Sequence, residues 1–285
     1  MQKRAVVSSF ATLDYVMTTA APAVEAGTTP GRIVASAWPR AGGAAFYAAR
    51  RLAAYGHMAH PLVAIGSDAG GGAFLRACRS DGVATDGITV QHGGRSPTCV
   101  LLYHQGGPYT CLLDCGTSPP AAPSVDQAAL IAQADLVAIA AGPPATTAAI
   151  LAQVRPAQTV AWIVKDDPAC FPESLRRDLT ARADFIFFNA AERALVDLAR
   201  PNFCRKQWMI ETHGANGVVM QQGRTSAHLP VTRVAAEDPT GAGDTLAGSV
   251  LAQILSGKED VAEALSQAIT EVREMLSNRE AGLEA

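Results

Sequence analysis

The sequence predicts an α/β fold in which helices flank a doubly wound, mainly parallel sheet. The first observation is a series of short apolar runs that are almost continuously hydrophobic, as in strands buried on both faces of a parallel sheet. The second is the helical patterns that separate these runs. The third is size: 285 residues, 48% of them hydrophobic, suffice for one large domain or two small ones, and we expect one, over residues 1–285.

The expected strands and helices alternate along the chain. Strand-like runs occupy residues 5–10, 61–66, 135–142, 159–164, 184–189 and 208–214. Helical patterns occupy residues 42–56, 124–134, 190–199 and 244–257. The first helix places Phe46, Ala49 and Leu52 on one face and ends at a glycine C-cap, Gly56. The second begins at an N-cap, Ser124. This alternation is typical of a doubly wound sheet.

One region departs from the alternation. Two strand-like runs, 98–104 and 109–114, are joined by Gln-Gly-Gly-Pro at residues 105–108, which predicts a hairpin. We therefore expect a small β lid contributed by about residues 89–117, and part of residues 10–40 is a candidate for the same lid. An exposed hairpin edge can pair with a second copy of the chain, so we expect a homodimer through the lid.

Composition excludes several classes of protein. The formal net charge of −3 gives no general attraction to nucleic acid. No run reaches the ~20 apolar residues of a membrane helix, and the first residues do not resemble a signal peptide. The six cysteines form no Cys-x-x-Cys pair and no zinc-finger spacing. We expect a cytoplasmic protein with reduced thiols that binds neither nucleic acid nor a membrane.

The stretch Ala-Ala-Glu-Asp-Pro-Thr-Gly-Ala-Gly-Asp-Thr-Leu, residues 235–246, places small residues between two acids, Asp238 and Asp244. Successive backbone N–H groups of Gly241, Ala242 and Gly243 at a helix start would form an anion site. A carboxylate beside a bound anion is unfavourable unless it has a task, such as accepting a proton from an attacking hydroxyl group. The alternative is a tight turn followed by an acid in a first helical turn, which is mildly stabilising.

This stretch resembles the C-terminal signature of the ribokinase-like (PfkB) carbohydrate kinases, Asp-x-Thr-Gly-Ala-Gly-Asp, which matches here at Asp238, Thr240, Gly241, Ala242, Gly243 and Asp244. Further motifs resemble those of the family and occur in the family's order. The matching positions are Asp14, Gly42, Gly43, Gly66, Asp68, Gly72, Asn189, Glu192, Thr212, Gly214 and Gly217. The resemblance runs from about residue 6 to about residue 268. For Asn189 and Glu192 alone, a helix capping box is an equal alternative.

The resemblance implies a ribokinase-like fold and the ATP-dependent phosphorylation, with Mg²⁺, of a hydroxyl group on a sugar-like or nucleoside-like alcohol. In this arrangement Asp244 is the general base, and the anion hole consists of the N–H groups of Gly241, Ala242 and Gly243. Mg²⁺ is ordered, through water, by Asn189 and Glu192. The nucleotide is lined by Thr212, Gly214, Gly217 and Thr240. The substrate is held by Asp14, Gly42, Gly43, Tyr47 and, from the lid, Thr98.

Three departures from the family pattern concern the ligand side of the site. Tyr47 stands where the family has Asn, so it is either a flat substrate contact or a half-buried helix residue. The family's Asp-x-Asn-x-Arg is replaced by Val-Lys-Asp-Asp-Pro; Asp166 or Asp167 can take the Asp role, and we interpret Lys165 as a strand-end charge rather than a substitute cation. Residues 268–270 read Ala-Ile-Thr, so neither the family's adenine contacts nor its activation by a monovalent cation is expected to carry over.

Two alternatives to a sugar or nucleoside kinase stay open. One is a catalytically silent protein of the same fold that binds a ligand, although the intact Gly-Ala-Gly-Asp sequence disfavours it. The other is a kinase of a vitamin-type alcohol. A dinucleotide-binding oxidoreductase would have Gly-x-Gly-x-x-Gly after the first strand, and it is disfavoured because residues 6–14 contain no glycine.

Overall fold

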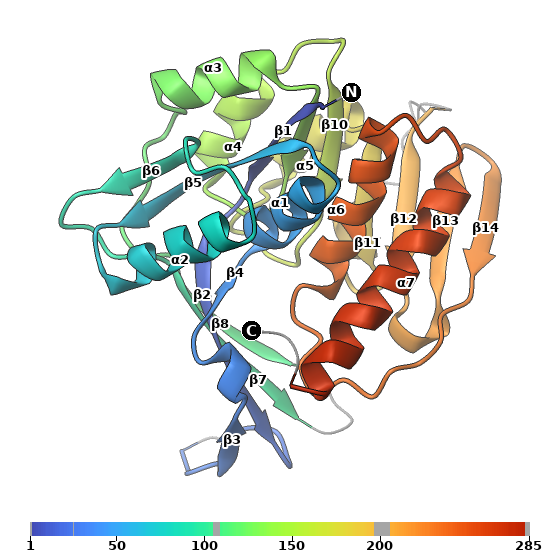
Figure 1. Cartoon of the computed structure of the whole chain (residues 1–285). Coiled ribbons are helices and arrows are strands. Elements are labelled where there is room, and N and C mark those ends of the chain that lie inside the picture. Colours follow the sequence, from blue (N-terminus) through green and yellow to red (C-terminus); the bar gives the residue numbers. More distant parts are fainter. Residues whose placement is uncertain (1, 25, 105–108, 197–205, 283–285) are drawn as a thin grey trace.

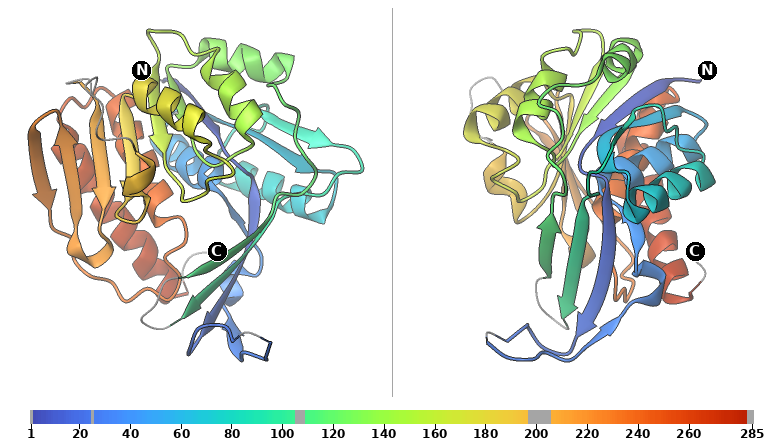
Figure 2. Two further views of the ribbon diagram at one scale, coloured as in Figure 1. Left: turned by 180° about the vertical axis from the view of Figure 1, so that it is seen from behind. Right: turned by 90° about the vertical axis from the view of Figure 1, so that its left-hand side faces the viewer.

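The computed structural model describes residues 2–24, 26–104, 109–196 and 206–282. It confirms the predicted α/β architecture: one large sheet lies between two layers of helices, and a smaller sheet projects from it (Figure 1 and Figure 2). Among these residues, no helix is long and apolar enough to cross a membrane. The expected turn at residues 105–108 and the end of the expected helix, residues 197–199, lie outside the described residues.

The large sheet has nine strands in the order β14-β13-β12-β11-β10-β9-β1-β5-β6. They are β1 (Arg4–Ser8), β5 (Met58–Gly66), β6 (Ile88–Gln91), β9 (Leu136–Ile139), β10 (Thr159–Ile163), β11 (Phe185–Asn189), β12 (Trp208–Thr212), β13 (Val218–Gln222) and β14 (Thr225–Leu229). Neighbouring strands are parallel from β6 to β12 and antiparallel from β12 to β14. Each expected strand run forms part of this sheet. The parallel strands bring their carboxyl ends to one edge, where ligands bind in such folds.

The structure corrects one boundary of the expected lid, which began at residue 89. β6 covers residues 88–91 and pairs in parallel with β5, so it belongs to the large sheet. It is an edge strand whose residues are only partly buried or exposed. Such a strand carries no continuous apolar run, which explains why the sequence pattern did not assign it to the large sheet.

Seven α-helices in the described residues cover the two faces of the large sheet. One face is covered by α1 (Ala44–Ala54), α2 (Ala69–Ser80), α6 (Ala242–Leu255) and α7 (Val261–Glu280). The other face is covered by α3 (Val125–Gln133), α4 (Pro144–Leu151) and α5 (Glu173–Arg182). Successive side chains of β1 point to opposite faces of the sheet, so this strand contributes to both hydrophobic cores. Ala5 and Val7 lie in the core under α1 and α6, and Val6 lies in the core on the other face. Figure 2 shows the two helix layers on opposite sides of the sheet.

Local sequence signals account for the helix ends. Ser124 and Gln127 form the capping box at the start of α3, which confirms the expected N-cap. Gly56 has φ +80° just after α1, as expected of a glycine C-cap. The expected helix over residues 190–199 is wrong within the described residues, where only a 3₁₀ turn, Glu192–Leu195, forms. Val196 after it is extended, so the backbone leaves the helical region there.

The small sheet combines two segments of the chain. Its strands are β2 (Thr12–Thr19), β3 (Gly31–Ile33), β4 (Arg40–Gly42), β7 (Thr98–His104) and β8 (Thr110–Asp114). The order is β3-β2-β7-β8, with β4 also pairing with β2. A short 3₁₀ helix, Ala35–Ala37, helps to bury its small core, which consists of Val16, Ala37, Cys99 and Leu101. We call this sheet the lid; it lies below the large sheet in Figure 1.

Gly248→Val is expected to lower the free energy of unfolding by about 1–3 kcal/mol, because it overpacks the contact between α1 and α6. A Cβ atom at Gly248 would lie 2.7 Å from the Cα atom of Ala48 and 2.8 Å from its carbonyl oxygen, and backbone cannot yield as a side chain can. Urea unfolding measures the change. Gly72→Ala in α2 is the control: its Cβ would meet only the end of Arg76, at 3.4 Å, so stability should be unchanged or higher.

Candidate active site

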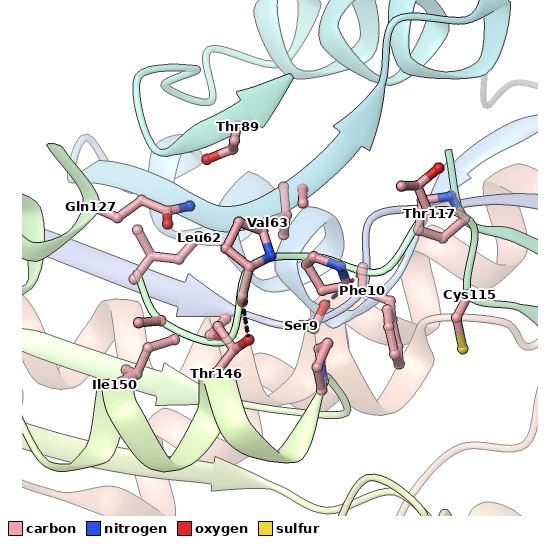
Figure 3. A pocket seen from close by; sticks show the side chains of 17 residues that line it. Ser9, Phe10, Leu62, Val63, Thr89, Cys115, Thr117, Gln127, Thr146 and Ile150 are labelled. Carbon is pink, nitrogen blue, oxygen red and sulfur yellow. Dashed lines mark hydrogen bonds between the residues drawn. The ribbon is translucent and has the colours of Figure 1, made fainter. Parts of the chain in front are cut away.

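A cavity of about 500 Å³ lies between the lid and the carboxyl ends of the parallel strands. Residues that follow β1, β10, β11 and β12 line it, together with the start of α6. A second cavity of about 30 Å³ lies behind Ser9 and Phe10, bordered by Gln127 and Ile150 (Figure 3). It has room for one or a few water molecules at most, so the larger cavity is the candidate site for ligands.

The glycine loop forms the entry to α6. Gly241 has φ +76°, a conformation that favours glycine, and helix α6 begins at Ala242. The Ala242 N–H donates to the carbonyl of Pro239 at 3.1 Å, so the expectation that it holds an anion is corrected: it closes a turn instead. The N–H groups of Gly241 and Gly243 have no main-chain acceptor within the described ranges. These two donors, with the helix dipole, leave an anion site at the loop.

Asp244 lies in the first turn of α6, with its side chain 7% exposed at the cavity wall. The ammonium nitrogen of Lys165 is 2.8 Å from Asp244 Oδ1. The interpretation of Lys165 as a strand-end charge is therefore wrong, because it pairs with the candidate base. Burial would lower the pKa of Lys165, but the nearby carboxylates of Asp244 and Glu192 outweigh burial and raise it.

Asp14 is a buried carboxyl group at the inner end of the lid. The Thr12 hydroxyl donates to Asp14 Oδ1 at 2.7 Å, and the Tyr47 hydroxyl donates to Oδ2 at 3.4 Å. A Cβ atom at Gly42 would lie 2.1 Å from Asp14 Oδ2, so the glycine makes room for the carboxyl group rather than touching a substrate. Gly43, the next residue, does line the cavity. Burial raises the pKa of Asp14 from 3.8 to about 6.

Asp14→Asn is expected to reduce the loss of stability at high pH. Because the folded state binds the proton of Asp14 more tightly than the unfolded chain, its stabilising contribution is complete below about pH 3.8 and is lost as the pH rises through about 6. The loss amounts to about 3 kcal/mol at about 1.36 kcal/mol per pH unit. About half of this loss, roughly 1.4 kcal/mol, falls between about pH 5 and pH 8. Urea unfolding of both proteins at these two pH values tests this: the variant should gain about that much on the wild type at the higher pH. Asp178→Asn, at an exposed position of α5, should follow the wild type.

Tyr47 supports the glycine loop and is also one of the residues that line the cavity. It is 2% exposed, and a Cβ atom at Gly241 would lie 2.6 Å from its ring. Its hydroxyl accepts from Arg40 Nε at 3.2 Å while donating to Asp14. Tyr47 is thus a buried residue that links Asp14 to the glycine loop, and the expected contact with a substrate stays a prediction.

Two guanidinium groups hold the segment before the glycine loop. Arg40, from β4, donates to Asp238 at 2.7 Å. Arg279, near the end of α7, donates to the carbonyls of Thr240 at 2.6 Å and Asp238 at 3.3 Å. Burial would raise the pKa of Asp238, but Arg40 and its other partners outweigh burial and lower it. Sequence reasoning missed both arginines, because no local pattern marks a contact between such distant segments.

Asn189, the last residue of β11, and Glu192, three residues later, form a reciprocal cap. Asn189 Oδ1 accepts from the Glu192 N–H at 3.1 Å, and Glu192 Oε2 accepts from the Asn189 N–H at 2.8 Å. The structure confirms the capping alternative, and because both residues also line the cavity, a role in binding a ligand stays a prediction. The described residues contain no group of three His, Cys, Asp or Glu that could cage a metal ion. The amide oxygen of Asn189 and the carboxylate of Glu192 are suited to hold a hydrated Mg²⁺ through water.

The other expected nucleotide residues divide into two groups. Thr212 ends β12 beside Asn189 and lines the cavity, and Thr240 lines it from the glycine loop. Gly214 and Gly217 belong to the turn that leads into β13 and do not line the cavity. A Cβ atom at Gly217 would lie 2.5 Å from the carbonyl of Leu229 on β14, so packing of the edge hairpin explains this glycine.

Residues 268–270 lie in the middle of α7, not in a loop. Ala268 is fully buried in the core beneath the large sheet. The carbonyl groups of a helix interior are used by the helix itself. Two expectations stay predictions: that the adenine contacts differ from those of the family, and that a monovalent cation does not activate the protein.

The lid supplies an apolar wall to the cavity. Its lining residues are Cys99, Leu101 and Tyr103 from β7, and Tyr109, Cys111 and Leu113 at β8. Successive residues of a strand alternate between its faces, so Thr98 faces away from the cavity and the expected substrate contact there is corrected. The Tyr103 hydroxyl is 2.9 Å from the Thr240 hydroxyl, which joins the lid to the glycine loop.

Comparisons with known proteins identify the family and the fold. The family model described as pfkB family carbohydrate kinase matches residues 8–270. Ribokinase from Cryptococcus neoformans var. grubii serotype A, solved with ADP, has a TM-score of 0.80 and 20% identity, covering 97% of this chain and 94% of that one. Arabidopsis thaliana ribokinase with ribose and ATP has a TM-score of 0.77, 18% identity and coverages of 97% and 93%.

A nucleoside kinase from Burkholderia thailandensis, solved with inosine, has the same overall similarity. Its TM-score is 0.77 at 18% identity, covering 96% of this chain and 91% of that one. A search of curated proteins gives no match. At these identities the solved structures establish the fold that the chain shares with them.

Proposed function

Since the chain belongs to the pfkB family of carbohydrate kinases, we propose that it transfers the γ-phosphoryl group of ATP to a hydroxyl group of a sugar-like or nucleoside-like alcohol. The observation that carries the proposal is the position of Asp244. Its carboxylate lies at the cavity wall, directly behind two N–H donors of the glycine loop. A base beside an anion site is the arrangement that phosphoryl transfer to a hydroxyl group needs.

In the proposed reaction Asp14 accepts a hydrogen bond from one hydroxyl group of the acceptor and orients it. Asp244 takes the proton of the attacking hydroxyl group as the new P–O bond forms. The N–H groups of Gly241 and Gly243 stabilise the negative charge of the transferring phosphoryl group. Mg²⁺, held through water by Asn189 and Glu192, would neutralise phosphate charge. Thr212 and Thr240 lie where the nucleotide would pass.

Names of similar structures support the acceptor class. Two are ribokinases, one of them solved with ribose and ATP, and one is a nucleoside kinase solved with inosine. The apolar lid wall, with Leu101 and Tyr109, suits an acceptor that has one flat or apolar face. A cytoplasmic location and a homodimer through the exposed edges of the lid, β3 and β8, stay predictions, and light scattering measures the latter.

The test is ATP consumption with Mg²⁺ over a panel of sugars, nucleosides and vitamin-type alcohols, with ATP binding measured separately by calorimetry. A sugar or nucleoside that is phosphorylated supports the proposal. Turnover confined to a vitamin-type alcohol would establish a kinase with a different acceptor. ATP binding without turnover on any acceptor, or no ATP binding, would favour a catalytically silent ligand-binding protein.

A further inference from the structure

The charges on the cavity wall are strongly unbalanced. Among the described residues, one ammonium group lines the cavity, that of Lys165, and the carboxyl groups are those of Asp14, Asp166, Asp167, Glu192 and Asp244. A bound nucleoside triphosphate would add several more negative charges to the cavity. Phosphoryl transfer depends mainly on positioning and on neutralising such charge. In the part of the chain that the structure describes, the wall therefore has one side chain that can supply a positive charge.

The main chain at Lys165 is anchored, and its side chain is partly exposed at the cavity wall. The preceding residue, Val164, donates its N–H to the carbonyl of Phe187 at 2.8 Å, and the carbonyl of Lys165 accepts from the Asp167 N–H at 2.7 Å. The Lys165 side chain is 37% exposed, whereas the Asp244 side chain that it contacts is 7% exposed. Because a lysine side chain has a flexible four-carbon stem, a movement of the ammonium group within the cavity requires no change in the backbone.

The ion pair has a chemical consequence. A carboxylate that is paired with an ammonium group accepts a proton less readily than an unpaired one. If the 2.8 Å contact between Lys165 and Asp244 persisted through the reaction, it would oppose the role of Asp244 as base. A phosphoryl group at the N–H donors of the glycine loop lies next to Asp244 and competes for the same ammonium group.

We propose that Lys165 is a second catalytic residue, whose ammonium group leaves Asp244 and binds the phosphoryl group during transfer. Asp244 then becomes an effective base only when the nucleotide is in place. The inference rests on the proposed kinase function. In the step, the bond between the γ-phosphorus and ADP breaks and the bond between phosphorus and the acceptor oxygen forms. The acceptor proton passes to Asp244, and Lys165 remains protonated throughout.

The first test compares Lys165→Met, Lys165→Arg and wild type. Methionine keeps the length of the side chain and removes its charge, so kcat should fall by about 10²–10³-fold. The KM for the acceptor should change by less than about threefold, because the ammonium group acts on the phosphoryl group. Lys165→Arg should recover part of the loss. Lys258→Met is the control: its ammonium group contacts Glu263 at 2.9 Å, away from the cavity, and kcat should be unchanged.

The second test does not depend on turnover. Calorimetry measures the binding of ADP alone and of ADP with aluminium fluoride, which imitates the phosphoryl group in transfer, each with Mg²⁺ and acceptor. Lys165→Met should weaken binding of the fluoride complex by about tenfold or more and leave ADP binding unchanged. The same loss should appear when Lys165→Met is added to Asp244→Asn. If Lys165 only holds Asp244 in place, the added substitution has no effect, and the proposal is overturned.

The outcomes separate this inference from the proposed function. A wild-type protein that phosphorylates no acceptor overturns both. An active wild type, an inactive Asp244→Asn variant and a Lys165→Met variant within about threefold of wild-type kcat overturn the inference about Lys165 alone.

Discussion

Asp244→Asn is expected to lower kcat by about 10²–10⁴-fold, the usual contribution of a general base. The substitution keeps the shape of the side chain and its place in the first turn of α6. It removes the group that accepts the proton and the negative charge that pairs with Lys165. Because Asp244 does not hold the acceptor in the proposed arrangement, the KM for the acceptor should change far less than kcat. Steady-state kinetics on an acceptor found in the panel measures both constants.

Asp126→Asn is the matched control for this substitution. Asp126 also lies in the first turn of a helix, α3, but is exposed and away from the cavity. If Asp244 served only to stabilise a helix start, both variants would show the same small loss of stability, less than about 1 kcal/mol, and full activity. Full activity of Asp244→Asn would therefore assign the carboxylate to helix capping and remove the base from the mechanism.

Gly241→Ala is expected to lower kcat by about 10²–10³-fold, the effect of losing a hydrogen-bond donor to the reacting anion. Two features of the structure forbid a Cβ atom here: the φ angle of +76°, and the Tyr47 ring 2.6 Å from its position. Tyr47 is buried and cannot yield without moving Asp14. The loop must move instead, which displaces its N–H donors. Thermal unfolding should show a lower Tm as well, because a left-handed conformation costs alanine roughly 1 kcal/mol.

Gly243→Ala is the control for stability. A Cβ atom at Gly243 would have no atom within 4 Å, and its φ angle is not in the left-handed region. Its Tm should match that of the wild type, so any loss of activity there would report a ligand in the space before α6. A Gly241→Ala variant with wild-type Tm and kcat would show that the loop tolerates a side chain and that its glycine has no role in positioning the donors.

The parts of the fold predicted from sequence are those with a local physical signal. Buried parallel strands are continuous apolar runs, and Ser124 and Gly56 are residues that helix ends require. The sequence pattern places the edge strand β6 in the lid, because a half-exposed strand lacks the continuous apolar run that marks a buried parallel strand. The lid segment from Thr12 to Gly42 carries no clear period, since its strands are short and pair with distant residues.

In the candidate site, too, only the features with a local signal in the sequence could be predicted. The glycine loop and Asp244 are contiguous in sequence, so their proximity could be predicted. Which face of β7 meets the cavity could not, because alternation alone does not say whether Thr98 or Cys99 points inward. The contact between Lys165 and Asp244 joins β10 to α6, and no spacing rule covers it. The sequence also leaves the role of Tyr47 open, because its contacts come from the distant segments β2, β4 and the glycine loop.

The paired guanidinium groups on Asp238 bear on the order in which the protein matures during synthesis. Arg40 leaves the ribosome 198 positions before Asp238, whereas Arg279 follows it by 41. A nascent chain that has been synthesised as far as Asp244 already contains the complete Gly-Ala-Gly-Asp sequence. It does not yet contain α7, whose Arg279 donates hydrogen bonds to the carbonyls of Thr240 and Asp238. Catalytic competence should therefore arise as a late, single event when α7 docks, so truncated translation products carry the signature without the activity.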